Sequence, residues 1–222
     1  MYESAYRVKQ SSAPPRLWKF LVLVIVLAAI WVLMLGPGFG TADRTILEAV
    51  YIGHRPLLKF LAVQVGHFGA PEATMVLTLG AGLLLVLQRR YWLAPVPAIA
   101  LLCGHGLAVL QRTLLGRPRP DGFDGLESLS APSLPPTRVV DPMNAYLLVG
   151  LLLATNPRYR RLGIIAALLI GGSNGVVRVL LGHHWPSDSV AGWAFGAIVA
   201  LTAYQVTKFL PTTAHVKPLW WK

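Results

Sequence analysis

Charged side chains are scarce in this sequence. They make up 13% of its 222 residues, whereas hydrophobic residues make up 55% and the mean hydropathy is +0.56. Ordinary soluble domains carry about 25% charged residues. Because the charges are also clustered, long apolar runs lie between them. The composition therefore argues against a soluble protein and predicts a single integral membrane domain.

Cysteine and acidic residues are few as well. Cys103 is the only cysteine, which excludes an intramolecular disulfide and a thiolate metal cluster. The nine acidic residues form no carboxylate cluster, so we expect no metal and no cofactor. Basic residues outnumber them and give a formal net charge of +11. Since the basic residues flank apolar segments, we expect a bilayer and its anionic headgroups as partners, and no nucleic acid.

The apolar runs predict an all-α bundle of six transmembrane helices within residues 20–210. A full crossing needs roughly 20 apolar residues. The predicted spans are 20–35, 71–87, 92–115, 143–154, 162–181 and 187–210. Between them, 41–67 is expected to form amphipathic helices on the membrane or packed beside it, and 116–142 to form a loop.

The basic residues near the span ends predict the orientation. They precede the first span and follow the second and fourth, which places the terminal segments 1–19 and 211–222 in the cytoplasm. The opposite face then holds 41–67, 116–142 and the turn at 182–187. We expect a bacterial inner (plasma) membrane, with this second face on the outer or periplasmic side.

Two stretches on the outer face combine arginine, histidine and aspartate. They read RTLLGRPRP at 112–120 and VRVLLGHHWPSDSVAGW at 177–193. Arginine forks bind phosphate oxygens, and a histidine beside a carboxylate can act as a nucleophile. Pro186 is suited to the first turn of a helix, whose N-terminus favours an anion. Arginines at span ends also commonly reach lipid headgroups, but the combination predicts a phosphate site.

These residues resemble the type 2 phosphatidic acid phosphatase family, which shares its core with vanadium haloperoxidases. Its motifs are KxxxxxxRP, PSGH and SRxxxxxHxxxD. Arg112 and Arg119-Pro120 match the first with arginine in place of lysine, and Arg178, His184 and Asp188 match the third with Val177 in place of serine. The resemblance implies that His184 is the catalytic nucleophile and that Asp188 orients it. Phosphate would be bound by Arg112, Arg119 and Arg178, with Arg117 and His183 as accessory residues.

The middle motif is absent from its expected place. The chain reads VVDPMNAYLLVG there, without the serine, glycine and histidine of PSGH. A loss of about four residues between Pro142 and Met143 would explain this. It would also explain why the run Met143–Ala154, about 18 Å long as a helix, is short for a span. His105 and His183 are the candidates to replace the missing histidine as a proton donor.

The resemblance implies an integral membrane phosphatase that hydrolyses lipid phosphates or diphosphates through a phosphohistidine at the outer face. Its partner would be a phosphorylated membrane lipid, either phosphatidic acid-like or a polyprenyl diphosphate such as undecaprenyl diphosphate. The alternative is a catalytically impaired relative that binds phosphorylated headgroups without efficient turnover. A plain structural membrane protein is the third reading, and it requires that Arg119, Arg178 and His184 do not converge. The oligomeric state, and hydrolase against phosphotransferase activity, are left open.

Overall fold

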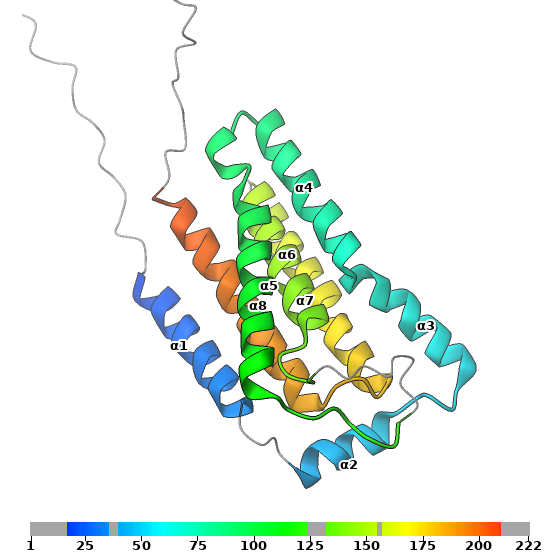
Figure 1. The fold of residues 1–222 in the computed structure, drawn as a ribbon. Coiled ribbons are helices and arrows are strands. Elements are labelled where there is room, and N and C mark those ends of the chain that lie inside the picture. The colour runs from blue at the N-terminus through cyan, green and yellow to red at the C-terminus, as the bar shows by residue number, and fades with distance from the viewer. Residues whose placement is uncertain (1–16, 36–39, 124–131, 155–156, 210–222) are drawn as a thin grey trace, which may run out of the picture.

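The structure is a computed structural model that describes residues 17–35, 40–123, 132–154 and 157–209. Its regular elements within these ranges are all helices (Figure 1). They are α1 (Leu17–Met34), α2 (Thr41–Val50), α3 (Pro56–Gly66), η1 (His67–Gly69), α4 (Pro71–Leu87), η2 (Tyr91–Leu93), α5 (Val96–Leu115), α6 (Thr137–Leu153), α7 (Pro157–Leu180) and α8 (Pro186–Thr207). The predicted all-α fold is confirmed, while most of the two predicted cytoplasmic segments lies outside the described residues.

Five stretches are long and apolar enough to cross a membrane. They are Leu17–Met34, Pro56–Leu87, Tyr91–Leu115, Pro157–Leu180 and Pro186–Thr207. Large apolar side chains cover their outer surfaces, as Val76, Leu102 and Leu169 do, with about seven-tenths of each side chain exposed. Such a surface is stable against lipid tails and not against water. The protein is therefore an integral membrane protein.

The prediction for the fourth span was wrong in its start and its length. α6 begins at Thr137 and runs without a break through Pro142 to Leu153, about 25 Å in all. The sequence predicts a loop over 116–142 because that segment is rich in Pro, Gly, Ser and Asp, and proline usually stops a helix. Here it lies inside a helix that neighbouring helices surround, where the lost backbone hydrogen bond is tolerated. The shortness that suggested four missing residues is therefore not present.

The segment expected to form amphipathic helices divides into two different parts. α2 fits the expectation, because it buries Asp43 and Leu47 and exposes most of its other side chains. α3 instead runs on through η1 into α4, and together they extend the second span downward in the view of Figure 1. The second span is therefore longer than predicted and begins near Pro56.

α6 is the central helix of the bundle, and α4, α5, α7 and α8 pack around it (Figure 1). Its leucines form the main apolar core with Leu85 of α4 and Ala200 of α8. The backbones of α6 and α7 come closest at Gly150 and Gly163, where a Cβ added to Gly150 would lie 2.8 Å from the carbonyl oxygen of Gly163. Small residues permit such close crossings between membrane helices.

This crossing generates a stability prediction. Gly150→Ala places a methyl group against the backbone of α7, and we expect the free energy of unfolding to fall by about 1–3 kcal/mol. Gly172→Ala is the matched control, because a Cβ at this α7 position meets nothing within 4 Å. Thermal unfolding of the purified protein in detergent measures both variants. Equal midpoints for the two would contradict the close crossing.

Candidate active site

The turn between α7 and α8 carries most of the candidate residues. Arg178 lies in the last turn of α7, His183 and His184 lie in the turn, and Asp188 lies in the first turn of α8. Gly182 enters the turn with φ +72°, a left-handed conformation that glycine adopts without strain. At the start of α8, Asp188 Oδ2 accepts a hydrogen bond of 3.0 Å from the backbone N–H of Trp185. The local sequence therefore fixes the spacing of the Arg-His-Asp set.

His184 is oriented mainly through a serine. Its Nδ1 lies 3.8 Å from Asp188 Oδ2, which is too long for a hydrogen bond. Ser133 lies between them: its Oγ is 3.3 Å from His184 Nδ1 and donates a short hydrogen bond to Asp188 Oδ2. Asp188 is 0% exposed and His184 is 5% exposed. The carboxylate therefore acts on the imidazole chiefly through the Ser133 hydroxyl.

His183 accepts hydrogen bonds from two of the three arginines that the resemblance assigns to phosphate, and not from Arg112. Arg178 Nη1 donates to His183 Nδ1 at 3.0 Å, and Arg119 Nη1 donates to the His183 carbonyl oxygen at 2.9 Å. Because Nδ1 accepts from a guanidinium, the proton of the neutral ring lies on Nε2. This Nε2 is buried and makes no hydrogen bond with the described residues. The structure thus gathers Arg119 and Arg178 beside His184, as a shared phosphate site requires.

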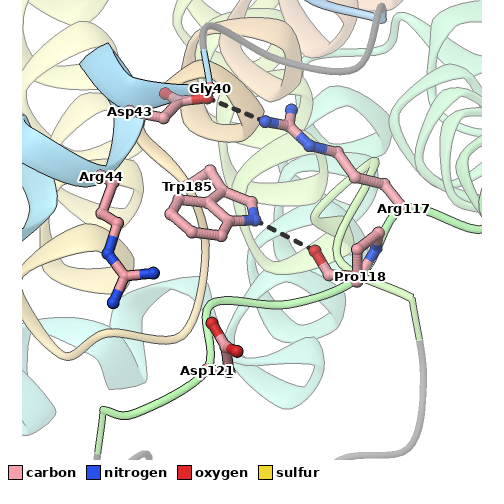
Figure 2. Close-up of a pocket in the computed structure, with 7 residues that line it drawn as sticks. All are labelled: Gly40, Asp43, Arg44, Arg117, Pro118, Asp121 and Trp185. Carbon is pink, nitrogen blue, oxygen red and sulfur yellow. Dashed lines mark hydrogen bonds and ion pairs between the residues drawn. The ribbon is translucent and has the colours of Figure 1, made fainter.

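Arg117 binds carboxylates. Its Nη1 donates to Asp188 Oδ1 at 2.7 Å, and its Nη2 donates to Asp43 Oδ2 of α2 at 2.8 Å (Figure 2). All three side chains are almost fully buried. The sequence placed Arg117 among the accessory residues, and the structure adds Asp43 as its partner.

Arg112 and His105 contact other partners than the catalytic pair. Arg112 Nη2 donates to the carbonyl oxygen of Pro135 and to Thr137 Oγ1, both at 3.1 Å, and so ties the end of α5 to the start of α6. His105 Nδ1 lies 2.7 Å from Asp141 Oδ2, between α5 and α6. His105, whose side chain is 47% exposed, is therefore paired with Asp141 and not with His184 or Asp188.

A cavity of about 300 Å³ opens next to the site, between the start of α2, the segment after α5 and the start of α8. The indole of Trp185 lines the cavity and donates to the carbonyl oxygen of Pro118 (Figure 2). The remaining lining residues are Gly40, Asp43, Arg44, Arg117 and Asp121. Among the described residues, no three His, Cys, Asp or Glu side chains are grouped so that they could hold a metal ion.

Comparisons with known proteins identify the family. A decaprenylphosphoryl-5-phosphoribose phosphatase of Mycobacterium tuberculosis is 30% identical over 149 residues, which cover 65% of this chain and 78% of the relative. Residues 142–211 match the family model of the PAP2 superfamily. The chain belongs to the PAP2 superfamily. The resemblance drawn from the motifs is therefore confirmed.

Two further PAP2-type relatives extend over most of the chain. An undecaprenyl-diphosphatase of Sulfolobus acidocaldarius is 26% identical over 198 residues, which cover 85% of this chain and 90% of the relative. The crystal structure of a transmembrane PAP2 type phosphatidylglycerolphosphate phosphatase from Bacillus subtilis superimposes with a TM-score of 0.77 at 19% identity, over 87% of this chain and 98% of that one. The structural likeness shows that the helical bundle is the PAP2 fold.

Three residues at this PAP2 site were not found from the sequence. Ser133 contacts His184 and Asp188 directly, and Asp43 reaches Asp188 through Arg117. The positive charge of Arg138 lies close enough to lower the pKa of His183. Ser133 and Arg138 flank the start of α6, in the segment that was expected to be a loop. Asp43 lies in a segment that only its amphipathic pattern distinguished, so its role becomes visible only in the folded chain.

Burial sets the charge state of both histidines. Burial, and then the charges of Arg178, His184, Arg119 and Arg138, together lower the pKa of His183 to about 4. Burial also lowers the pKa of His184, although the Asp188 carboxylate acts in the opposite direction. Both rings are therefore neutral at neutral pH. His183 is consequently unsuited to act as a protonated general acid there.

These shifts predict how stability depends on pH. The folded pKa of His183 lies below its ordinary value of 6.5, so its contribution is complete above about pH 6.5. As the pH falls from 6.5 towards 4, the unfolded chain binds a proton that the folded chain does not, and stability decreases. We expect His183→Gln, which cannot titrate, to show a shallower decrease. Chemical unfolding at several pH values measures it, and parallel curves would contradict the shift.

Proposed function

We propose that this protein is a membrane phosphatase that hydrolyses lipid phosphates or diphosphates through a phosphohistidine on His184. The observation that carries the proposal is the buried His184–Ser133–Asp188 chain beside Arg119 and Arg178. A protein that only bound headgroups would not need a neutral imidazole oriented in this way. The named activities of the relatives, on phosphorylated isoprenoid lipids, support the same chemistry.

The geometry supports a two-step reaction. With the Nδ1 proton donated towards Ser133, the Nε2 lone pair of His184 forms a bond to phosphorus and the bond to the leaving oxygen breaks. Asp188 stabilises the positive charge that the imidazole gains. The leaving oxygen departs as a phosphate anion or, where it is a lipid alkoxide, takes its proton from solvent water. Water then bonds to phosphorus, the P–N bond breaks with its electron pair returning to His184 Nε2, and both water protons leave with the phosphate product. Arg119 and Arg178 hold the phosphoryl oxygens throughout.

The start of α6 takes the place of the family's middle motif in this proposal. Pro136-Thr137-Arg138-Val139 begins the helix, with a proline and a hydroxyl residue as in PSGH, and Val139 at the position of the histidine. Val139 is fully buried and packs against Gly192 of α8, so it cannot donate a proton. Arg138 adds a positive charge where the family has glycine. The general acid is thus missing while the phosphate site is retained.

The membrane placement is part of the same proposal. Residues 20–210 form the phosphatase-like domain, with both terminal segments in the cytoplasm and the site on the outer face of a bacterial inner membrane. The distribution of basic residues supports this orientation. A reporter enzyme fused after α8 would test it.

The nucleophile is tested by substitution. We expect His184→Ala to lower phosphate release from lipid phosphates by at least about 10³-fold, because no other group can form the covalent intermediate. His67→Ala, at an exposed histidine in η1, is the matched control and should retain activity. Release is measured on the purified protein in detergent, together with trapping of an acid-labile phosphoenzyme. If His184→Ala keeps the activity of His67→Ala, or if a phosphoenzyme still forms in His184→Ala, the mechanism is refuted.

The missing general acid predicts a preference for diphosphates. A lipid alkoxide needs a proton to leave, whereas a phosphate leaving group, with a second pKa near 6, needs one much less. General acids contribute typically 10²–10⁴-fold, so we expect kcat/KM on an isoprenoid diphosphate to exceed that on the monophosphate of the same tail by about 100-fold or more. Because both substrates carry the same lipid tail, a difference in kcat/KM between them comes from the headgroup. Comparable turnover of the two lipids would show that another group supplies the proton.

A further inference from the structure

We propose that Asp43 and Arg117 are positioning residues that hold the carboxylate of Asp188 in its working orientation, and so make α2 a functional part of the active site. The inference rests on the proposed role of Asp188. It assigns to Arg117 a different task from binding phosphate. It also gives a task to Asp43, which no motif contains.

The contacts form a closed bridge from α2 to α8. The guanidinium of Arg117 donates to Asp188 Oδ1 at 2.7 Å, to Ser187 Oγ at 2.9 Å and to Asp43 Oδ2 at 2.8 Å. Asp43 in turn accepts from the Ser187 backbone N–H at 2.9 Å and from its hydroxyl at 2.5 Å. Figure 2 shows the Arg117 side chain directed at Asp43 across the edge of the cavity. Both terminal nitrogens of the Arg117 guanidinium and both oxygens of Asp43 therefore have partners on another part of the chain.

Burial makes these contacts obligatory. The side chains of Arg117, Asp43 and Asp188 are 9%, 3% and 0% exposed. Removing one partner of a buried ion pair leaves an uncompensated charge, which is strongly unfavourable. The positive charge of Arg117 is thus committed to two carboxylates. This leaves Arg119 and Arg178 as the better-placed arginines for a phosphoryl group.

The bridge restricts rotation of the Asp188 carboxylate group. Its Oδ2 accepts from Ser133 Oγ and from the Trp185 backbone N–H, and its Oδ1 accepts from Arg117. With both oxygens held, the carboxylate cannot rotate, and Oδ2 stays directed at the Ser133–His184 contact. Loss of Arg117 would release Oδ1, and loss of Asp43 would release the far end of the Arg117 fork. Either change should loosen the orientation of His184.

A purely structural tie predicts a different outcome from a positioning role. If the bridge only joined α2 to the bundle, variants would be less stable, but the folded fraction would have normal kcat. If the bridge positions Asp188, the folded variants keep KM and lose kcat, because a small misplacement of a catalytic group can cost about 10²-fold in rate. The His184 ring would also lose its single tautomer. The two roles are therefore separable by experiment.

The experiment compares Asp43→Asn, Arg117→Lys, Arg117→Met and the double variant Asp43→Asn with Arg117→Met. We expect kcat to fall about 10- to 100-fold in Asp43→Asn and further in Arg117→Met at unchanged KM. Arg117→Lys should retain an intermediate rate, since it keeps the charge without the fork. The double variant should match Arg117→Met alone, because both substitutions break one bridge. Glu48→Gln, which removes the exposed Arg44–Glu48 pair of α2 by the same acid-to-amide change at a residue outside the cavity, is the matched control and should leave kcat unchanged.

A second readout needs no turnover. ¹⁵N NMR of the histidine rings, assigned with His184→Gln, should show one neutral tautomer of His184 protonated on Nδ1 in the wild type and in Glu48→Gln. In Asp43→Asn and Arg117→Met we expect a mixture of tautomers. A wild type without phosphatase activity would refute the proposed function, and the ring spectra would still decide the positioning role. Folded Asp43→Asn with normal kcat and an unchanged His184 spectrum would overturn the inference.

Discussion

The site depends on keeping one carboxylate charged without contact with water. Asp188 is fully buried, and a buried carboxylate is stable only if donors occupy its oxygens. Those donors come from three separate parts of the chain: the first turn of α8, Ser133 before α6, and Arg117 after α5. The segments between the spans therefore supply hydrogen-bond donors that the buried carboxylate of Asp188 needs. Their folding over the end of the bundle is what makes a charged Asp188 possible.

The same requirement extends outward, because Arg117 is itself buried. Its second carboxylate partner comes from α2, which the amphipathic pattern alone would place loosely at the membrane surface. Asp43 instead anchors α2 to the N-terminus of α8. A chain of desolvated charges thus sets the position of an interfacial helix. The apolar spans provide the scaffold, while the placement of these connecting segments follows from charge pairing.

Local and long-range features differed in how far the sequence could predict them. Arg178, His184 and Asp188 lie on two helix ends joined by a tight turn, so their spacing along the chain fixes their spacing in space. Ser133 and Asp43 reach the same carboxylate across 55 residues and through a bridging arginine, and no periodicity marks them. The start of α6 was misplaced because Pro142 is a strong local signal against a helix. Packing of neighbouring helices on all sides of α6 outweighs that signal. A prediction made from one segment at a time does not include such packing.

Charge balance connects the fold to the choice of ligand. Arg119, Arg138 and Arg178 lie close enough to His183 to act on its pKa, and Arg117 pairs with the carboxylates of Asp43 and Asp188. With both histidines neutral, four positive and two negative groups leave about two positive charges. A phosphate monoester carries about −1.5 to −2 at neutral pH. Burial and these arginines both disfavour a protonated His183 or His184, and under the proposed function the same arginines would favour a phosphoryl dianion.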